Sequence, residues 1–91
     1  MANPITTTGT TSDPVSTTHN SGESVRQWVA RHDEAVEGAT PSGDTLTTDW
    51  TADSGSQETK SNRKAGESDA DFLQRHVQEY LGDMNANPPV P

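Results

Sequence analysis

The feature that most constrains the fold of this chain is an internal repeat with an offset of 44 residues. When residues 22–38 are aligned with residues 66–82, six of the seventeen positions are identical. The identities are Gly22-Glu23-Ser24 with Gly66-Glu67-Ser68, Arg31-His32 with Arg75-His76, and Gly38 with Gly82. Self-similarity at a fixed offset indicates that one supersecondary unit is present twice. The sequence therefore predicts a duplicated domain.

Each repeated segment is predicted to form an amphipathic helix, over residues 24–37 and 68–81. Apolar residues and one histidine recur in each at the spacing of a single helical face. These stripes are Val25, Trp28, Val29, His32 and Val36, and then Phe72, Leu73, His76, Tyr80 and Leu81, with Met84 beyond. Ser24 and Gln27 form a capping box, and Ser68 is the second N-cap. Gly38 and Gly82 are expected to end the helices, Gly38 in a left-handed conformation.

A β-hairpin is predicted over residues 45–63, before the second helix. Leu46, Thr48, Trp50 and Ala52 alternate with polar residues, which is the period of a half-buried strand. Residues 53–55 contain the turn, where glycine allows a positive φ. The return strand, over residues 56–63, is polar throughout, and we expect it at a sheet edge or exposed on both faces.

The first 21 residues are mostly Thr, Ser, Asn, Gly and Pro, and they leave two alternatives open. Low hydrophobicity is typical of disorder, but β-branched threonine also favours strands. The repeat favours a hairpin here, since a hairpin precedes the second helix. Residues 5–8 then correspond to residues 46–49. This hairpin lacks an aromatic residue, so it is the weaker one and could become ordered only on binding.

Together these units predict an α+β fold with a tandem ββα–ββα repeat. The four strands form one antiparallel sheet, and both helices pack on one of its faces. The first repeat covers residues 1–43, the second covers residues 44–84, and residues 85–91 are a Pro-rich extended tail. We expect the termini to be flexible. The predicted core consists of Trp28, Val29, Val36, Leu46, Trp50, Phe72, Leu73 and Tyr80.

Composition excludes several classes of protein. Only 26% of the residues are hydrophobic, so the core must be thin. The chain has no cysteine, which excludes disulfide scaffolds and thiolate metal sites. Its net charge of −8 opposes direct binding to nucleic acid or to an anionic membrane. Because no signal peptide or membrane-spanning segment is evident, we expect a cytoplasmic or virion-associated protein.

The two Arg-His pairs, Arg31-His32 and Arg75-His76, are the most suggestive candidate site, although their role is uncertain. Two related histidines could share a metal ion or exchange protons near neutral pH. A third metal ligand is not evident at matching positions, so the sequence predicts no metal site and no cofactor. The favoured interpretation is structural. Each histidine would border the apolar stripe and donate to a carbonyl or carboxylate, while the arginines cover the helix surface or pair with Glu23 and Glu67.

Four further residues are candidates for an interaction surface. Lys60, Arg63 and Lys64 are the basic cluster of the chain, and they could contact phosphate or protect a strand edge. Trp50 could stack on a base or a sugar, although such a residue more often packs against helices. No nucleophile motif or carboxylate pair indicates catalysis.

The sequence therefore favours a non-enzymatic structural or protein-interaction module that acts through a sheet edge or an exposed sheet face. Its partner would be another protein or a second copy of the chain, as in a homodimer. One alternative is an acidic mimic of nucleic acid that inhibits a basic enzyme. Another is a small domain adapted to high salt, in which the acidic residues serve solvation.

Overall fold

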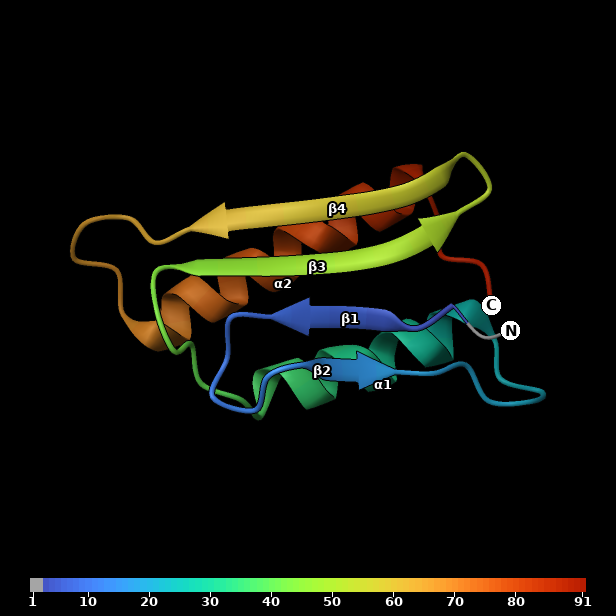
Figure 1. Ribbon diagram of the computed structural model, residues 1–91, viewed down its shortest axis with the longest axis horizontal. Helices are drawn as coiled ribbons and strands as arrows, with labels where there is room; N and C mark the ends of the chain where they lie inside the picture. Colours follow the sequence, from blue (N-terminus) through green and yellow to red (C-terminus); the bar gives the residue numbers. More distant parts are fainter. Residues whose placement is uncertain (1–2) are drawn as a thin grey trace.

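The computed structural model describes residues 3–91, and it confirms the predicted α+β class and the four-stranded antiparallel sheet (Figure 1). The elements follow one another in the order β1 (Ile5–Thr8), β2 (Val15–Thr17), α1 (Val25–Glu37), β3 (Thr45–Ala52), β4 (Gly55–Asn62) and α2 (Asp69–Ala86). Of the two alternatives for the Thr-rich segment, the structure has the hairpin: β1 and β2 are both strands of the sheet.

The two strands that begin the two halves lie side by side in the middle of the sheet. The strand order is β2-β1-β3-β4, so β1 pairs with β3 and the other two strands form the edges. Thr7 is directly opposite Thr48 in the antiparallel β1–β3 pair. In the β3–β4 hairpin, Ala52 is opposite Gly55, which leaves a two-residue turn. The register therefore places the junction of the two halves at Thr7 and Thr48.

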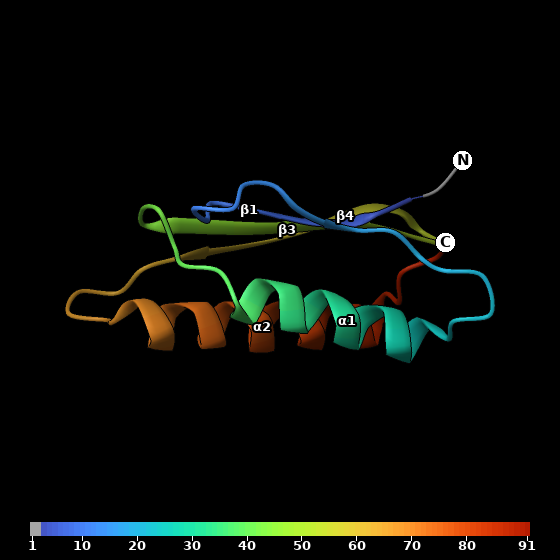
Figure 2. The same cartoon turned by 90° about the horizontal axis from the view of Figure 1, so that it is seen from below.

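The helices form a second layer below the sheet. Figure 2 shows α1 and α2 on the same side of the sheet, and no helix of the described residues covers the other side. α1 packs mainly against β2 and α2 mainly against β4. Each helix therefore lies under the hairpin that precedes it in the chain.

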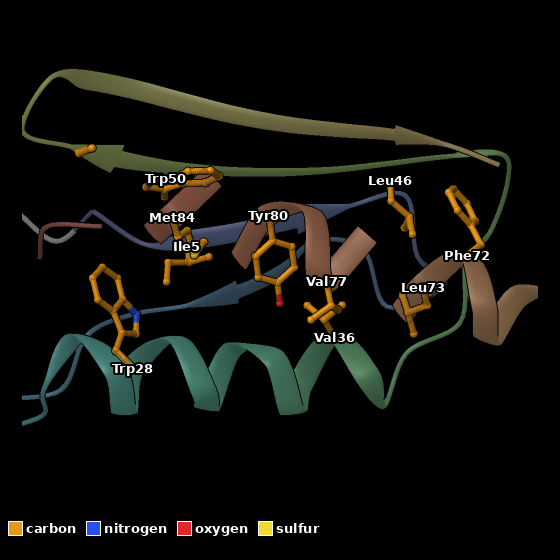
Figure 3. Close-up of a cluster of buried hydrophobic side chains, with 11 residues drawn as sticks. Ile5, Trp28, Val36, Leu46, Trp50, Phe72, Leu73, Val77, Tyr80 and Met84 are labelled. Atoms are coloured by element: carbon orange, nitrogen blue, oxygen red, sulfur yellow. The ribbon is translucent and has the colours of Figure 1, made fainter. Parts of the chain in front are cut away.

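The core lies between these two layers. Figure 3 shows Trp28 at one end, Tyr80 in the middle, and Leu73 and Phe72 at the other end. All the predicted core residues are buried except Val29, which is only partly buried. The sequence-based list omitted several members: Ile5, Ala52, Val77 and Met84, together with buried polar side chains on the inner face of the sheet.

The helix starts agree with the sequence prediction, but the helix ends differ from it. Ser24 and Gln27 form the capping box, and the Ser68 side chain caps α2. Gly38 does cap α1, although its φ of −81° is right-handed rather than left-handed. Gly82 does not end α2, which continues to Ala86, because Met84 still packs into the core beyond it.

The C-terminal tail is bound to the sheet rather than free. The Trp50 indole N–H donates to the carbonyl of Asn87 at 2.8 Å, and the Val90 amide donates to the carbonyl of Thr51 at 2.8 Å. Pro89 is buried. The predicted flexible C-terminus is therefore wrong for residues 87–90. The first two residues of the N-terminus lie outside the described residues.

The turn after β1 depends on a glycine. Gly9 has a φ of +101°, and a Cβ at this position would lie 2.2 Å from the backbone oxygen of Thr45. The backbone oxygen cannot move without disturbing the start of β3, so any side chain at position 9 clashes with the central strand pair.

We expect Gly9→Ala to lower the free energy of unfolding by at least about 2 kcal/mol, because it adds both φ strain and a backbone clash. Gly82→Ala is the matched control: it lies inside a helix with open space around it, and it should raise the stability by up to about 1 kcal/mol. Urea unfolding of both variants tests this. Equal effects of the two substitutions would contradict the role assigned to Gly9.

Candidate functional site

The two repeat-related histidines lie at the centre of the molecule. His32 on α1 and His76 on α2 are fully buried, and both nitrogens of each ring are hydrogen-bonded to hydroxyl groups of the sheet. The sequence predicted that they border the apolar stripe and donate to a carbonyl or carboxylate. That prediction is wrong: the partners of the ring nitrogens are the hydroxyl groups of threonine and serine side chains on the inner face of the sheet.

The two sets of histidine contacts match each other. The Nδ1 atom of His32 is 2.8 Å from the hydroxyl of Thr17 on β2, and Nδ1 of His76 is 2.6 Å from that of Ser61 on β4. The offset between Thr17 and Ser61 is again 44 residues. These contacts attach each helix to the edge strand above it.

The Nε2 atoms are joined through the central strands. Nε2 of His32 is 2.8 Å from the Thr7 hydroxyl, and Nε2 of His76 is 2.7 Å from the Thr48 hydroxyl. The hydroxyls of Thr7 and Thr48 are themselves 2.7 Å apart. The two rings are thereby linked through the place where the two halves of the sheet meet.

Burial keeps both imidazoles neutral at physiological pH. Desolvation lowers the pKa of His32 to about 4, with smaller contributions from His76 and Arg31. Desolvation also lowers the pKa of His76 to about 4; the nearby Glu79 carboxylate partly opposes it and Arg75 adds to it. The edge of each ring also packs against Tyr80, at centroid distances of 6.0 Å and 5.5 Å. The rings therefore act as hydrogen-bonding core residues.

The arginine beside each histidine binds a glutamate, as the sequence predicted. Arg31 donates from Nε and Nη2 to the Glu23 carboxylate at 2.9 and 2.8 Å, and Arg75 binds Glu67 in the same way at 2.8 Å for both bonds. Bidentate pairs of this kind are stronger than single hydrogen bonds. The arginine bond, together with a backbone amide bond, lowers the pKa of each glutamate to about 2.

Each of these arginines also fastens the end of an edge strand. Arg31 donates to the carbonyl of Thr18, just beyond β2, at 2.6 Å, and Arg75 donates to that of Asn62, the last residue of β4, at 2.7 Å. The Arg-His motif thus has two structural tasks in each half. The histidine holds the middle of the sheet to the helix, and the arginine holds the strand end to the helix start.

The structure divides the predicted basic cluster. Arg63 binds Asp44 at 3.1 Å and Asp69 at 2.8 Å, and its guanidinium lies 4.8 Å from the centre of the Phe72 ring. These contacts occupy Arg63 within the fold. Lys60, on β4, and Lys64, in the following loop, are exposed. Only the two lysines remain candidates for contact with a partner.

Trp50 is a core residue and does not stack on an external ligand, which the sequence had left as the less favoured possibility. Its side chain points between the sheet and α2 and is 3% exposed. The alternation of β3 placed it on the inner face, where it packs with Ile5 and Met84 (Figure 3). The favoured interpretation, packing against the helices, is therefore confirmed.

The outer face of the sheet is polar. Its side chains are Thr6 and Thr8 of β1, Ser16 of β2, Thr45, Thr47, Asp49 and Thr51 of β3, and Ser56, Glu58, Lys60 and Asn62 of β4. Neighbouring strands are connected on this face, for example between the Thr6 and Ser16 hydroxyls at 3.2 Å. Asp49 and Glu58 are directly opposite each other. Partial burial, and then Glu58, raise the pKa of Asp49.

Of the two edge strands of the sheet, β4 is the longer. β4 has eight residues and pairs only with β3. The prediction of an edge strand is correct, but exposure on both faces is not, because Thr59 and Ser61 are buried against α2. In a hairpin with a two-residue turn, the two residues that flank the turn, here Ala52 and Gly55, form a hydrogen-bonded pair, and every second pair after them is hydrogen-bonded too. The backbone groups of residues 56, 58, 60 and 62 therefore point to the open edge.

Two further features limit the chemistry of the described part of the chain. No group of three or more His, Asp or Glu side chains among residues 3–91 could hold a metal ion, and no helix there is long and apolar enough to cross a membrane. Ser61, His76 and Glu79 combine residue types found in hydrolases. Ser61 is buried, however, and its hydroxyl donates to Glu79 rather than to the neighbouring His76, so the serine oxygen is not presented to solvent as an activated nucleophile.

The pKa values of the two histidines predict a stability that depends on pH. Each ring has a folded-state pKa of about 4 against an ordinary value of 6.5, so the unfolded chain binds protons more readily. The contribution of the two histidines to the free energy of unfolding is complete above pH 6.5. It declines as the pH falls towards 4, by up to about 3 kcal/mol per ring. The two Glu-Arg pairs contribute their full stability above the ordinary glutamate pKa of 4.5 and lose it only below that pH, so they do not cause the decline measured here. Urea unfolding at pH 7.0, 5.5 and 4.5 measures the decline, and a constant stability over this range would contradict it.

The Thr7–Thr48 link predicts a second effect on stability. Thr48→Val keeps the shape of the side chain but leaves His76 Nε2 and the Thr7 hydroxyl without their partner. We expect a loss of about 3 kcal/mol, since each unsatisfied buried group costs about 1–3 kcal/mol. Thr47→Val, on the outer face of the same strand, is the control and should change the stability by less than about 0.5 kcal/mol. Similar unfolding midpoints for the two variants would show that the link is dispensable.

Comparison of the chain with protein-family models, with curated proteins and with solved structures found no match in any of the three. Function is therefore inferred from the geometry of this chain alone.

Proposed function

We propose that this chain is a duplicated ββα–ββα domain that serves as a non-enzymatic interaction module, and that it binds a strand of its partner along the open edge of β4. The duplication is supported by contacts that recur at the same offset as the sequence repeat. The Glu-Arg pairs, the serine caps and the Nδ1 partners of the two histidines all recur 44 residues apart. Both copies keep the helix on one side of the sheet, which leaves the other side and the edges free.

The single observation that carries the proposed function is the row of outward backbone groups at Ser56, Glu58 and Lys60, which pair with no other strand. An extended partner segment can satisfy these amides and carbonyls by adding a fifth antiparallel or parallel strand. β4 contains no proline, and its outward side chains are short or flexible. The other edge strand, β2, has three residues and offers far fewer backbone groups.

The outer face of the sheet is a weaker candidate than the edge. Layers that pack face to face bury apolar side chains, whereas this face carries threonines, serines and charged residues. Its side chains are also partly satisfied by hydrogen bonds to one another, as between Thr45 and Asn62 at 3.0 Å. A partner bound to the outer face would have to displace water from polar side chains. A partner strand bound to the β4 edge would instead gain backbone hydrogen bonds.

A proline at the edge tests this proposal. Lys60→Pro removes one outward N–H without breaking the β3 ladder, since proline is tolerated on the open side of an edge strand. We expect a partner that binds the native chain to bind this variant at least tenfold more weakly. Lys60→Thr is the matched control, because it removes the charge but keeps the N–H, and it should retain binding. Circular dichroism verifies that both variants fold.

The readout is affinity capture from the source cells with all three proteins, together with light scattering over a concentration series to detect a second copy as the partner. Binding lost with Lys60→Pro and kept with Lys60→Thr supports the edge. A partner that binds both variants equally excludes the edge as the binding site. If the native chain captures nothing and stays monomeric, the interaction module itself is excluded.

A further inference from the structure

One continuous chain of hydrogen bonds crosses the interior and takes a side chain from every element of the fold. In order, its members are Thr17 on β2, His32 on α1, Thr7 on β1, Thr48 on β3, His76 on α2, Ser61 on β4, and Glu79 on α2. The first six are buried, and the Glu79 side chain is 44% exposed. The chain therefore leads from the core to a carboxylate at the surface.

The Glu79 end has a fixed direction. An ionised carboxylate only accepts hydrogen bonds, so the Ser61 hydroxyl donates its proton to Glu79. The Ser61 oxygen must then accept from the other neighbour, Nδ1 of His76. A neutral imidazole has one N–H, so Nε2 of His76 is bare and accepts from the Thr48 hydroxyl.

The same accounting continues into the first half. The Thr48 hydroxyl donates its single proton to His76, so its oxygen accepts a hydrogen bond from the Thr7 hydroxyl. Thr7 in turn accepts from His32, whose Nε2 must carry the proton. The Nδ1 atom of His32 is then bare and accepts from the Thr17 hydroxyl. Every bond follows from the one before it, because each hydroxyl has a single proton.

We propose that Glu79 sets one direction for this hydrogen-bond chain and thereby holds the two repeat-related histidines in opposite tautomers, with the proton on Nδ1 in His76 and on Nε2 in His32. The sequence supplies the asymmetry. The position 44 residues before Glu79 is occupied by Ala35, which cannot accept a hydrogen bond from Thr17. The carboxylate is present at only one end of an otherwise matched arrangement.

The fixed direction couples the two halves of the molecule. If His76 gains a second proton, both of its nitrogens donate, and Thr48 must turn its hydroxyl towards Thr7. Thr7 must then donate to Nε2 of His32, which forces that ring to move its own proton to Nδ1. A proton taken up in the second half thus changes the tautomer in the first.

The charged and titratable groups around the rings leave this accounting intact. Arg31 and Arg75 are bound to glutamates on the outside of the helices, and both disfavour a second proton on the adjacent histidine. Tyr80 lies edge-on to both rings, but its hydroxyl donates to Asp33 and takes no part in the chain. The strands contribute hydroxyls alone: Thr7, Thr17, Thr48 and Ser61.

Nitrogen-15 NMR of the imidazole rings in the full chain at pH 7 tests the proposal, because protonated and bare ring nitrogens have distinct chemical shifts. We expect bare Nδ1 with protonated Nε2 in His32, and the reverse in His76. If the two rings show the same tautomer, the proposal is overturned, whatever the behaviour of any variant.

The role of Glu79 is tested by Glu79→Ala, with Gln78→Ala on the exposed side of α2 as the matched control. Without the carboxylate the chain can run in either direction, so we expect a measurable population of the reversed tautomers in Glu79→Ala and none in Gln78→Ala. Unchanged tautomers in Glu79→Ala would overturn the claim that Glu79 sets the direction.

Discussion

The hydrogen bond between the hydroxyls of Thr7 and Thr48 lies where the two halves of this molecule meet. It joins the two central strands on the inner face of the sheet, and each hydroxyl also binds the histidine of the helix below it. Sheet pairing, helix docking and the junction of the halves therefore depend on one small polar cluster. An apolar pair at these positions would pack as well, but it would leave the Nε2 atoms of two buried imidazoles without partners.

This cluster explains how a chain with 26% hydrophobic residues can form a two-layer domain. Aliphatic and aromatic side chains make up the two ends of the core, and in its middle two histidines and four hydroxyl residues surround Tyr80 and satisfy one another's polar groups. Such a network stabilises the fold only while it is complete, since a missing partner leaves a costly buried group. In the proposed arrangement the hydrogen-bond chain also has a direction, because each imidazole ring donates to one hydroxyl and accepts from the other.

The architecture could be predicted because it rests on local signals and on the repeat. The serine caps, the alternation from Leu46 to Ala52 and the position of Trp28 are each readable from neighbouring residues. The end of α2 could not be read in this way, since Gly82 is a good terminator locally and tertiary contacts of Met84 carry the helix past it. The tail was missed for the same reason: its partners Trp50 and Thr51 lie far away in the sequence.

The histidine cluster was located by the sequence but its chemistry was not. The repeat selected His32 and His76, and helical periodicity placed them near the apolar face. Their partners are inward-facing threonines and a serine, and of these the predicted alternation had placed only Thr48 on the half-buried face of a strand. For Thr7 the missing signal is the correspondence of the two strands: Ile5 matches the inward Leu46, so Thr7 matches the inward Thr48 and lies opposite it in the sheet.

The difference between the two halves is as informative as their similarity. A duplicated unit with identical polar residues would leave the hydrogen-bond chain free to run in either direction, with two arrangements of equal energy. Ser61 and Glu79 in the second half, against Thr17 and Ala35 in the first, remove that degeneracy by adding a single acceptor at one end. In the proposed arrangement, the acceptor that sets the direction is a side chain at the surface, where its presence does not have to be accommodated by the packing of the core.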